Sequence, residues 1–278
     1  MIEEKVKKDI GFFFSQRLIK NSFYTGLALG FVGIIPFTFN FLVARSFGRE
    51  ILGSINITLS FCLIITIFIT NFFGSAGNKY LAEYRGSRKL EHFQFVFKVM
   101  LGTPLIILSI IAVILSWNWI YFSNKFSLQT DLLISIIIYI FLRSFYILFR
   151  RALYGIDLVK SYTANEIISD LIMLSAIGYV TYNKQSSFLI ECYLLSYFIF
   201  CLLSTATLLK RFKSIKITLN RSNHFDQRDV MQKFTHYGLV SMIGTVASTG
   251  TGYLSIIIIG MYLSNSDAGI YSSVLSIV

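Results

Sequence analysis

Long apolar runs dominate the sequence and restrict the fold more than any other feature. An α-helix rises 1.5 Å per residue, so about 20 apolar residues cross the ~30 Å hydrocarbon core of a bilayer. Only 14% of the 278 residues are charged, against roughly 25% in a soluble domain. The runs predict seven transmembrane helices and the start of an eighth near Ala268; they cover residues 23–44, 55–76, 99–118, 131–149, 163–182, 188–209 and 236–262.

The spanning elements are expected to be helices. Proline occurs only at Pro36 and Pro104, so most of each run can keep its internal backbone hydrogen bonds, as the bilayer core demands. The first run starts too late and is too long for a cleaved signal peptide, and no small-residue cleavage site follows it. The sequence therefore predicts an all-α, polytopic membrane helix bundle of seven helices plus the start of an eighth.

Lysine and arginine lie mainly in alternate connections between the runs. Of the 25 basic residues, 20 fall on the side that includes the N-terminus, 4 fall on the other side, and Arg143 lies inside a run. Because positively charged loops resist translocation, this asymmetry places the N-terminus in the cytoplasm and predicts a multi-pass protein of the cell inner (cytoplasmic) membrane. The same distribution assigns the net charge of +11 to membrane topology rather than to nucleic-acid binding.

The chain divides at its longest basic connection. Residues 1–22 mix apolar and charged side chains and predict a cytoplasmic amphipathic leader on the anionic inner leaflet, with a solvated leader as the alternative. Residues 23–209 are expected to form a six-helix N-terminal lobe and residues 210–235 a basic cytoplasmic connection. Residues 236–278 are expected to be the start of a C-terminal lobe that is incomplete within this sequence.

Two segments of the sequence resemble one another. Residues 47–60, after the first run, and residues 263–276, after the seventh, each combine a short acidic turn with a glycine that opens the next helix. These glycines, Gly53 and Gly269, lie 216 residues apart. Six spans separate the paired helices, so both copies point the same way across the membrane. Parallel repeats of this kind are typical of transporters with a substrate path between two halves; chance similarity of two apolar hairpins is the alternative.

Five charged residues fall inside the predicted spans, and three of them, Arg143, Glu166 and Asp170, are candidate binding residues. Such a residue costs about 2.5–3.5 kcal/mol on insertion scales, so each one needs a reason. Arg143 in the fourth run and Asp170 in the fifth lie at a similar depth, and Glu166 lies one turn from Asp170 on the same helix face. One interpretation is a cavity in which Arg143 binds a pyrophosphate or an anionic sugar, while the carboxylates tune it or take part in ion coupling. The alternative is a structural ion pair between Arg143 and Asp170.

Two runs contain helix-interrupting residues at positions related by the repeat. The first contains Gly33, Pro36 and the polar Asn40, which we include among the substrate-binding candidates; the seventh contains Gly250 and Gly252 among three hydroxyl side chains. Proline removes a helical hydrogen bond and glycine permits bending. We expect Gly33, Pro36, Gly250 and Gly252 to act as hinges beside a transport path, with close helix packing through small residues as the alternative.

Four basic residues mark the cytoplasmic mouth of the bundle: Lys79, Arg85, Arg150 and Arg151. They can attract a diphosphate headgroup from the inner leaflet, or serve only as topology determinants. We expect no catalytic residue, no metal and no cofactor, because the sequence contains no nucleophile elbow, no phosphate-cradling loop and no HExxH zinc pattern.

Three stretches of the chain carry a resemblance to a known family. They are Phe47–Gly53, Asn71–Gly74 followed by Lys79–Tyr84, and Gly260–Leu263 running into Asp267–Ser272. Together they resemble the polysaccharide flippases of the multidrug/oligosaccharidyl-lipid/polysaccharide exporter superfamily, the Wzx-type transporters of lipid-linked oligosaccharides. The resemblance covers essentially the whole chain. Because proteins of this kind have two lobes, it implies a complete first lobe followed by the truncated start of a second.

The resemblance also implies a function. Members of the family that the chain resembles move an undecaprenyl-pyrophosphate-linked oligosaccharide from the inner to the outer leaflet by alternating access. The oligosaccharide is then used for surface polysaccharides such as O-antigen or capsule. The implied partners are membrane lipid, the lipid-linked oligosaccharide and a glycan polymerase or other polysaccharide assembly proteins, without nucleic acid. The alternatives are a cation-coupled multidrug exporter of the same superfamily and a truncated membrane remnant that transports nothing. None of the three is an enzyme.

Overall fold

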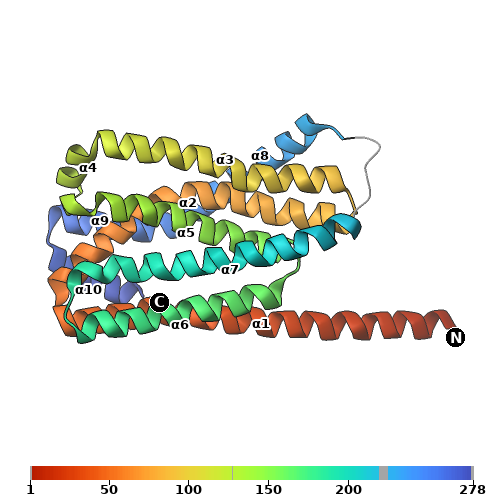
Figure 1. Ribbon diagram of the computed structural model, residues 1–278, viewed down its shortest axis with the longest axis horizontal. Helices are drawn as coiled ribbons and strands as arrows, with labels where there is room; N and C mark the ends of the chain where they lie inside the picture. The colour runs from red at the N-terminus through yellow and green to blue at the C-terminus, as the bar shows by residue number, and fades with distance from the viewer. Residues whose placement is uncertain (1, 127, 219–224, 277–278) are drawn as a thin grey trace.

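Helices and the turns between them make up all of the chain that the structure, a computed structural model, describes. The backbone is described for residues 2–126, 128–218 and 225–276, and the side chains for residues 19–126, 128–211 and 225–276. The long helices run along the long axis of an elongated bundle (Figure 1). Their bounds are α1 (Ile2–Phe47), α2 (Arg49–Gly86), α3 (Leu90–Trp117), α4 (Trp119–Lys125), α5 (Leu133–Gly155), α6 (Val159–Tyr182), α7 (Leu189–Thr218), α8 (Gln227–Thr245), α9 (Thr251–Tyr262) and α10 (Asn265–Leu275). Two short 3₁₀ helices, η1 (Thr130–Leu132) and η2 (Ser186–Phe188), and a π-helix, η3 (Val246–Gly250), complete the described elements.

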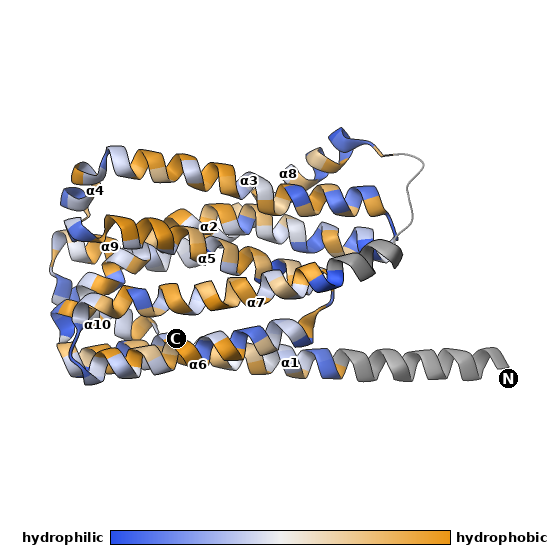
Figure 2. Ribbon diagram, in the orientation of Figure 1, coloured by the Kyte–Doolittle hydropathy of each residue, from blue (hydrophilic) through white to orange (hydrophobic). Residues whose placement is uncertain are grey.

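Six helical segments of the described residues are long and apolar enough to cross a membrane. They are Ile19–Phe47, Arg49–Gly86, Leu90–Trp117, Thr130–Gly155, Ser186–Arg211 and Gln227–Tyr262. Large apolar side chains on these helices face outward, as Ile106, Ile110 and Val113 do on α3. Apolar residues fill the middle of the bundle and polar residues gather toward its ends (Figure 2). This pattern fits a multi-pass, all-helical membrane protein.

The fifth predicted span, residues 163–182, forms helix α6 but is not one of these six segments. The reason is that Asn165, Glu166 and Asp170 interrupt its apolar run. All three are buried, and α6 packs along α1 and α7, so the polar groups face protein rather than lipid. The seventh crossing, and the start of an eighth on α10, stay predictions.

Two predicted segments lie partly outside the described residues. α1 includes the backbone of residues 2–18, but the side chains of the predicted amphipathic leader are not described there. The basic connection includes residues 219–224, which also lie outside the described residues. After these residues and still within the predicted connection, Asp226 caps α8, because its carboxylate accepts a hydrogen bond from the backbone N–H of Arg228 at 2.9 Å.

The two repeat segments lie against each other, because α2 and α10 cross near their first turns. A Cβ added to Gly53 would lie 1.6 Å from the carbonyl oxygen of Asn265, and one added to Gly269 would lie 2.4 Å from the carbonyl oxygen of Arg49. Arg49 and Asn265 are equivalent positions of the repeat, as are the two glycines. The contact is therefore reciprocal, which indicates a local two-fold relation between the segments, with both helices starting at the same end of the bundle.

A hydrogen bond continues this relation further along the two helices. Asn56 Nδ2 donates to Ser272 Oγ at 2.8 Å, and these two residues are again 216 positions apart. Both side chains are buried. The glycine of each copy thus has a packing role, since the absence of a side chain lets the two helix backbones touch.

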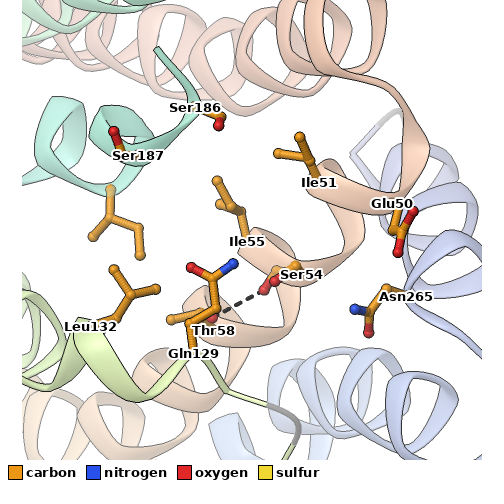
Figure 3. Close-up of a pocket in the computed structure, with 11 residues that line it drawn as sticks. Glu50, Ile51, Ser54, Ile55, Thr58, Gln129, Leu132, Ser186, Ser187 and Asn265 are labelled. Carbon is orange, nitrogen blue, oxygen red and sulfur yellow. Dashed lines mark hydrogen bonds between the residues drawn. The ribbon is translucent and has the colours of Figure 1, made fainter.

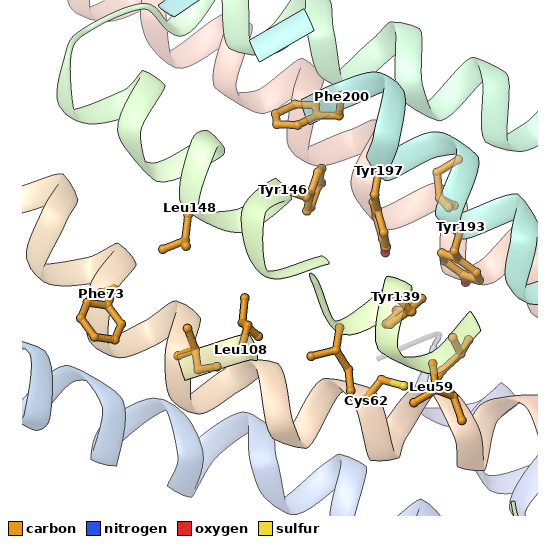
Figure 4. Packing of buried hydrophobic residues seen from close by; sticks show 14 of the residues in the cluster. Leu59, Cys62, Phe73, Leu108, Tyr139, Tyr146, Leu148, Tyr193, Tyr197 and Phe200 are labelled. Carbon is orange, nitrogen blue, oxygen red and sulfur yellow. The ribbon is translucent and has the colours of Figure 1, made fainter. Parts of the chain in front are cut away.

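Aromatic side chains from α5 and α7 form part of the hydrophobic core of the bundle. Tyr139 and Tyr146 come from α5, and Tyr193, Tyr197 and Phe200 from α7 (Figure 4). The ring centres of Tyr146 and Phe200 are 4.7 Å apart, and those of Tyr139 and Tyr197 are 5.7 Å apart. Edge-to-face contacts at such distances add to the apolar burial and hold the rings in fixed positions.

Candidate functional site

A cavity of about 750 Å³ lies inside the bundle. Its walls come from α1, α2, α5, α6 and α7 on one side and from η3, α9 and α10 on the other. The volume is within the range of roughly 300–1,000 Å³ that is usual for small-ligand sites. Three of the predicted binding residues, Asn40, Arg143 and Asp170, line this central cavity. They come from three different helices, and the fold brings them around one space.

Arg143 is the single basic side chain that lines the central cavity within the described residues. Its Nη1 donates to the hydroxyl of Tyr197 at 2.9 Å, and its guanidinium carbon lies 5.1 Å from the ring centres of both Tyr146 and Tyr197. Its Nε is buried and has no hydrogen-bond partner in the described part of the chain. The tyrosine rings therefore hold the cation in place while several of its N–H donors stay available.

The two carboxylates of α6 occupy different positions. Asp170 lines the central cavity, whereas Glu166 is fully buried and accepts a hydrogen bond from the Tyr146 hydroxyl. One oxygen of each carboxylate has no partner among the described residues. Among these residues neither carboxylate forms an ion pair with Arg143. The Arg143–Asp170 ion pair is thus not formed among the described residues, and the guanidinium donates a hydrogen bond to Tyr197.

Tyrosines line much of the central cavity, and we did not predict them from the sequence. They are Tyr139, Tyr146, Tyr193, Tyr197 and Tyr253. The sequence does contain a pattern that indicates four of these tyrosines, on two helices. The first two lie one turn before and one turn after Arg143 of α5, and the next two lie one turn apart on α7, so each pair shares a helix face. Tyrosines at helical spacing around an arginine inside a predicted span could therefore have identified this wall.

Asn40 belongs to a chain of polar side chains that joins three helices. Its Oδ1 accepts a hydrogen bond from Asn56 Nδ2 at 3.1 Å, and Asn56 also donates to Ser272. All three side chains line the central cavity. They link α1 and α2 to α10, so this wall of the cavity connects helices from the two ends of the sequence.

The predicted hinge residues lie beside the same cavity in differently built helices. Gly33 and Pro36 line it from α1, which continues as one helix through both positions. Gly252 lines it from α9, directly after the π-helix η3, which ends at Gly250. A π-turn inside a transmembrane helix is a local interruption of the kind found at functional sites. The hinge roles of all four residues stay predictions.

The four basic residues predicted for the cytoplasmic mouth, Lys79, Arg85, Arg150 and Arg151, do not line the central cavity. Each instead contacts a different side chain of the protein. Their partners are Tyr237 for Lys79, Asp157 for Arg85, Tyr162 for Arg150 and Ser75 for Arg151. Each of the four is thus already in contact with a partner within the protein.

The chemistry of the central cavity is that of binding. It offers one fixed cation, one carboxylate, amides and tyrosine hydroxyls, and it has the faces of several aromatic rings. Within the described ranges no group of three or more His, Cys, Asp or Glu side chains could hold a metal ion. Such a set suits a ligand that has an anionic group and many hydroxyls.

Comparison with known proteins gives a family but no individual relative. No curated protein and no solved structure matches the chain significantly. One family model matches residues 18–278, a range that includes all six apolar segments and every residue that lines the central cavity. The chain therefore belongs to the family described as polysaccharide biosynthesis protein, whose members are transporters rather than enzymes.

Proposed function

We propose that this protein moves an undecaprenyl-pyrophosphate-linked oligosaccharide from the inner to the outer leaflet of the cytoplasmic membrane. In this proposal the chain crosses the membrane seven times, and its N-terminus and its basic connections lie in the cytoplasm. The glycan then enters a surface polysaccharide, such as O-antigen or capsule, through a polymerase or another assembly protein. Family membership supports a role in polysaccharide biosynthesis, and the cavity supports the choice of substrate.

The observation that carries the proposal is the single guanidinium in a tyrosine-lined cavity inside the bundle. Arg143 uses one N–H for Tyr197, and a guanidinium has five N–H donors. It stays charged at any physiological pH and binds phosphate oxygens in a two-pronged geometry. A pyrophosphate that enters the cavity therefore meets a fixed cation with donors to spare.

The rest of the cavity suits the sugars. Tyrosine presents a flat apolar face together with a hydroxyl, and a sugar ring likewise has apolar C–H faces and a polar edge. Moving a hydroxyl through hydrocarbon without a partner costs roughly 2–7 kcal/mol. A path lined with hydroxyls and amides avoids that cost, while the prenyl chain of the substrate stays in lipid.

Movement in this proposal is a rocking of the two lobes about the central cavity. Gly33 and Pro36 in α1, and Gly250 and Gly252 after the π-turn, let the helices that line the cavity bend. Asp170 and Glu166 adjust the charge around Arg143 as the substrate enters and leaves. The basic residues of the cytoplasmic mouth act as topology determinants, since each already contacts a side chain of the protein.

Cells that lack the chromosomal copy of the gene provide the test, because surface glycan then depends on the introduced variant. Arg143→Ala should reduce export by about 10-fold or more, since hydrogen bonds to charged groups contribute about 1.5–3 kcal/mol. Arg143→Lys keeps the positive charge but lacks the planar guanidinium that binds phosphate through two N–H groups, and it should give an intermediate level of export. The matched control is Arg228→Ala, an exposed arginine on α8. Normal surface glycan with Arg143→Ala, at normal abundance in the membrane, would refute the proposal.

A second candidate is a cation-coupled drug exporter. The observation that favours it is Asp170, a cavity carboxylate with one oxygen unpartnered among the described residues. In that case Asp170→Asn alters drug tolerance, and Arg143→Ala leaves glycan export unchanged. Measuring both properties in both variants separates the two candidates.

A further inference from the structure

A second cavity lies at the end of the bundle opposite the basic connections. It has a volume of about 320 Å³ and forms where the first turns of α2 and α10 meet the turns before α5 and α7 (Figure 3). It shares no lining residue with the central cavity. Because basic connections stay in the cytoplasm, this outer cavity faces the outside of the cell in the proposed topology.

The outer cavity is rich in polar side chains that are free to bind a ligand. Six of them take part in no side-chain hydrogen bond within the described residues; they are Glu50, Ser54, Gln129, Ser186, Ser187 and Asn265. The hydroxyl of Thr58 is already used, since it donates to the backbone carbonyl of Ser54 at 3.0 Å. The outer cavity thus presents hydroxyls and amides from α2, α10 and both turns toward one space.

The charge of the lining restricts the class of ligand. Among the described residues no lysine or arginine lines the outer cavity, and the one charged group in this lining is the carboxylate of Glu50. A phosphate would meet no cation there, so the pyrophosphate end of the substrate is not the ligand. A carboxylate and neutral amides are good acceptors and donors for hydroxyl groups.

The apolar side chains and the volume of the outer cavity are also consistent with a ligand that carries hydroxyl groups. Ile51, Ile55 and Leu132 add apolar side chains to the polar ones (Figure 3). A ligand that fills this space has apolar faces and a hydroxyl-bearing edge, as a pyranose ring has. The volume is at the lower end of the roughly 300–1,000 Å³ range for small-ligand sites, which suits a short saccharide and excludes the whole lipid-linked substrate.

We propose that the outer cavity is a saccharide site that binds the sugar end of the glycan on the external side of the membrane. This inference rests on the proposed function for the identity of the glycan. Asn265 begins α10, and its carbonyl meets Gly53 of α2. A sugar held there bridges the two repeat-related helices.

The chain contains a natural reporter for this site. Of its two tryptophans, Trp119 is buried and its Nε1 donates to the carbonyl of Thr130 at 2.8 Å, next to Gln129 in the sequence. In a Trp117→Phe background, Trp119 is the sole source of tryptophan fluorescence. The purified full chain in detergent is titrated with lipid-free oligosaccharide that mild acid releases from the lipid-linked glycans of the source cells.

We expect a saturable change in Trp119 fluorescence. The double variant Gln129→Ala and Ser187→Ala should raise the half-saturating concentration about 10-fold, because two neutral hydrogen bonds are lost. Both side chains are exposed, Gln129 just before η1 and Ser187 on the short helix η2, so the fold is expected to persist. The matched control, Gln185→Ala, removes an exposed glutamine of the α6–α7 turn that does not line the outer cavity and should titrate like the parent.

Three results would overturn the inference: no saturable change, equal half-saturation in the double variant and the control, or the same change with sodium phosphate or sodium chloride alone. Translocation of lipid-linked glycan in liposomes is measured separately. If translocation fails but the fluorescence titration is intact, the proposed transport function is refuted and the proposed saccharide site is supported. If translocation succeeds but no saturable fluorescence change is seen, the transport function is supported and the saccharide site is refuted.

Discussion

The reciprocal crossing of α2 and α10 makes Gly53 a sharp test of the structure. In Gly53→Ala the new Cβ would lie 1.6 Å from the Asn265 carbonyl oxygen. Because carbon and oxygen in close contact are about 3.3 Å apart, α10 must retreat by roughly 1.7 Å at this point. Overpacking of this kind costs about 1–3 kcal/mol. Losing the Asn56–Ser272 hydrogen bond adds about 1 kcal/mol.

The expected total of about 2–4 kcal/mol corresponds to a fall in melting temperature of roughly 5–15 °C, at about 2–4 °C per kcal/mol for a chain of this size. A thiol-reactive fluorogenic dye measures unfolding directly, because Cys62 and Cys192 are free and buried. The matched control is Gly102→Ala in α3, where an added Cβ meets nothing within 4 Å. It should melt at the parent temperature or slightly above it. A Gly53→Ala protein that melts like the Gly102→Ala protein would refute the reciprocal crossing.

Three further predictions follow from the buried polar contacts. Asn56→Ala removes two hydrogen bonds of about 1 kcal/mol each and should lower the melting temperature by roughly 4–8 °C, at about 2–4 °C per kcal/mol; an unchanged value would contradict the polar link between the helices. Tyr197→Phe keeps the ring but removes the acceptor for Arg143, so liposome transport should slow about 2- to 10-fold at normal melting temperature; unchanged transport would mean that this bond does not position the arginine. Glu166→Gln retains an acceptor for its buried tyrosine partner and should melt close to the parent, whereas Glu166→Leu should melt several degrees lower; equal melting of the two would show that the hydroxyl needs no partner.

The spans could be predicted from the sequence because they depend on a short-range property. A run of about 20 apolar residues has one stable arrangement in a bilayer, whatever its neighbours are. α6 shows the limit of that argument. Its polar residues are tolerated because α1 and α7 cover them, and which helices lie next to one another cannot be read from hydropathy.

The cavity residues could be predicted only in part. Arg143 and Asp170 are conspicuous because a charge inside a span needs a reason, and both line the central cavity. Their partners are set by side-chain directions on different helices. The ion pair between Arg143 and Asp170, the alternative that the sequence left open, is not formed among the described residues, and Tyr197 is the hydrogen-bond partner of Arg143. The contact of Gly53 with Asn265 likewise depends on how two helices cross, although the spacing of 216 residues already linked their segments.

Translocation by purified protein tests the central claim most directly. The protein is reconstituted into liposomes with a fluorescent undecaprenyl-pyrophosphate-linked oligosaccharide, and a membrane-impermeant quencher follows the fraction that has changed leaflet. The parent and Arg228→Ala should equilibrate the substrate across the bilayer at the same rate, and Arg143→Ala should be about 10-fold slower or more. Equal rates for Arg143→Ala and Arg228→Ala, or no translocation by the parent protein, would contradict a path through the central cavity.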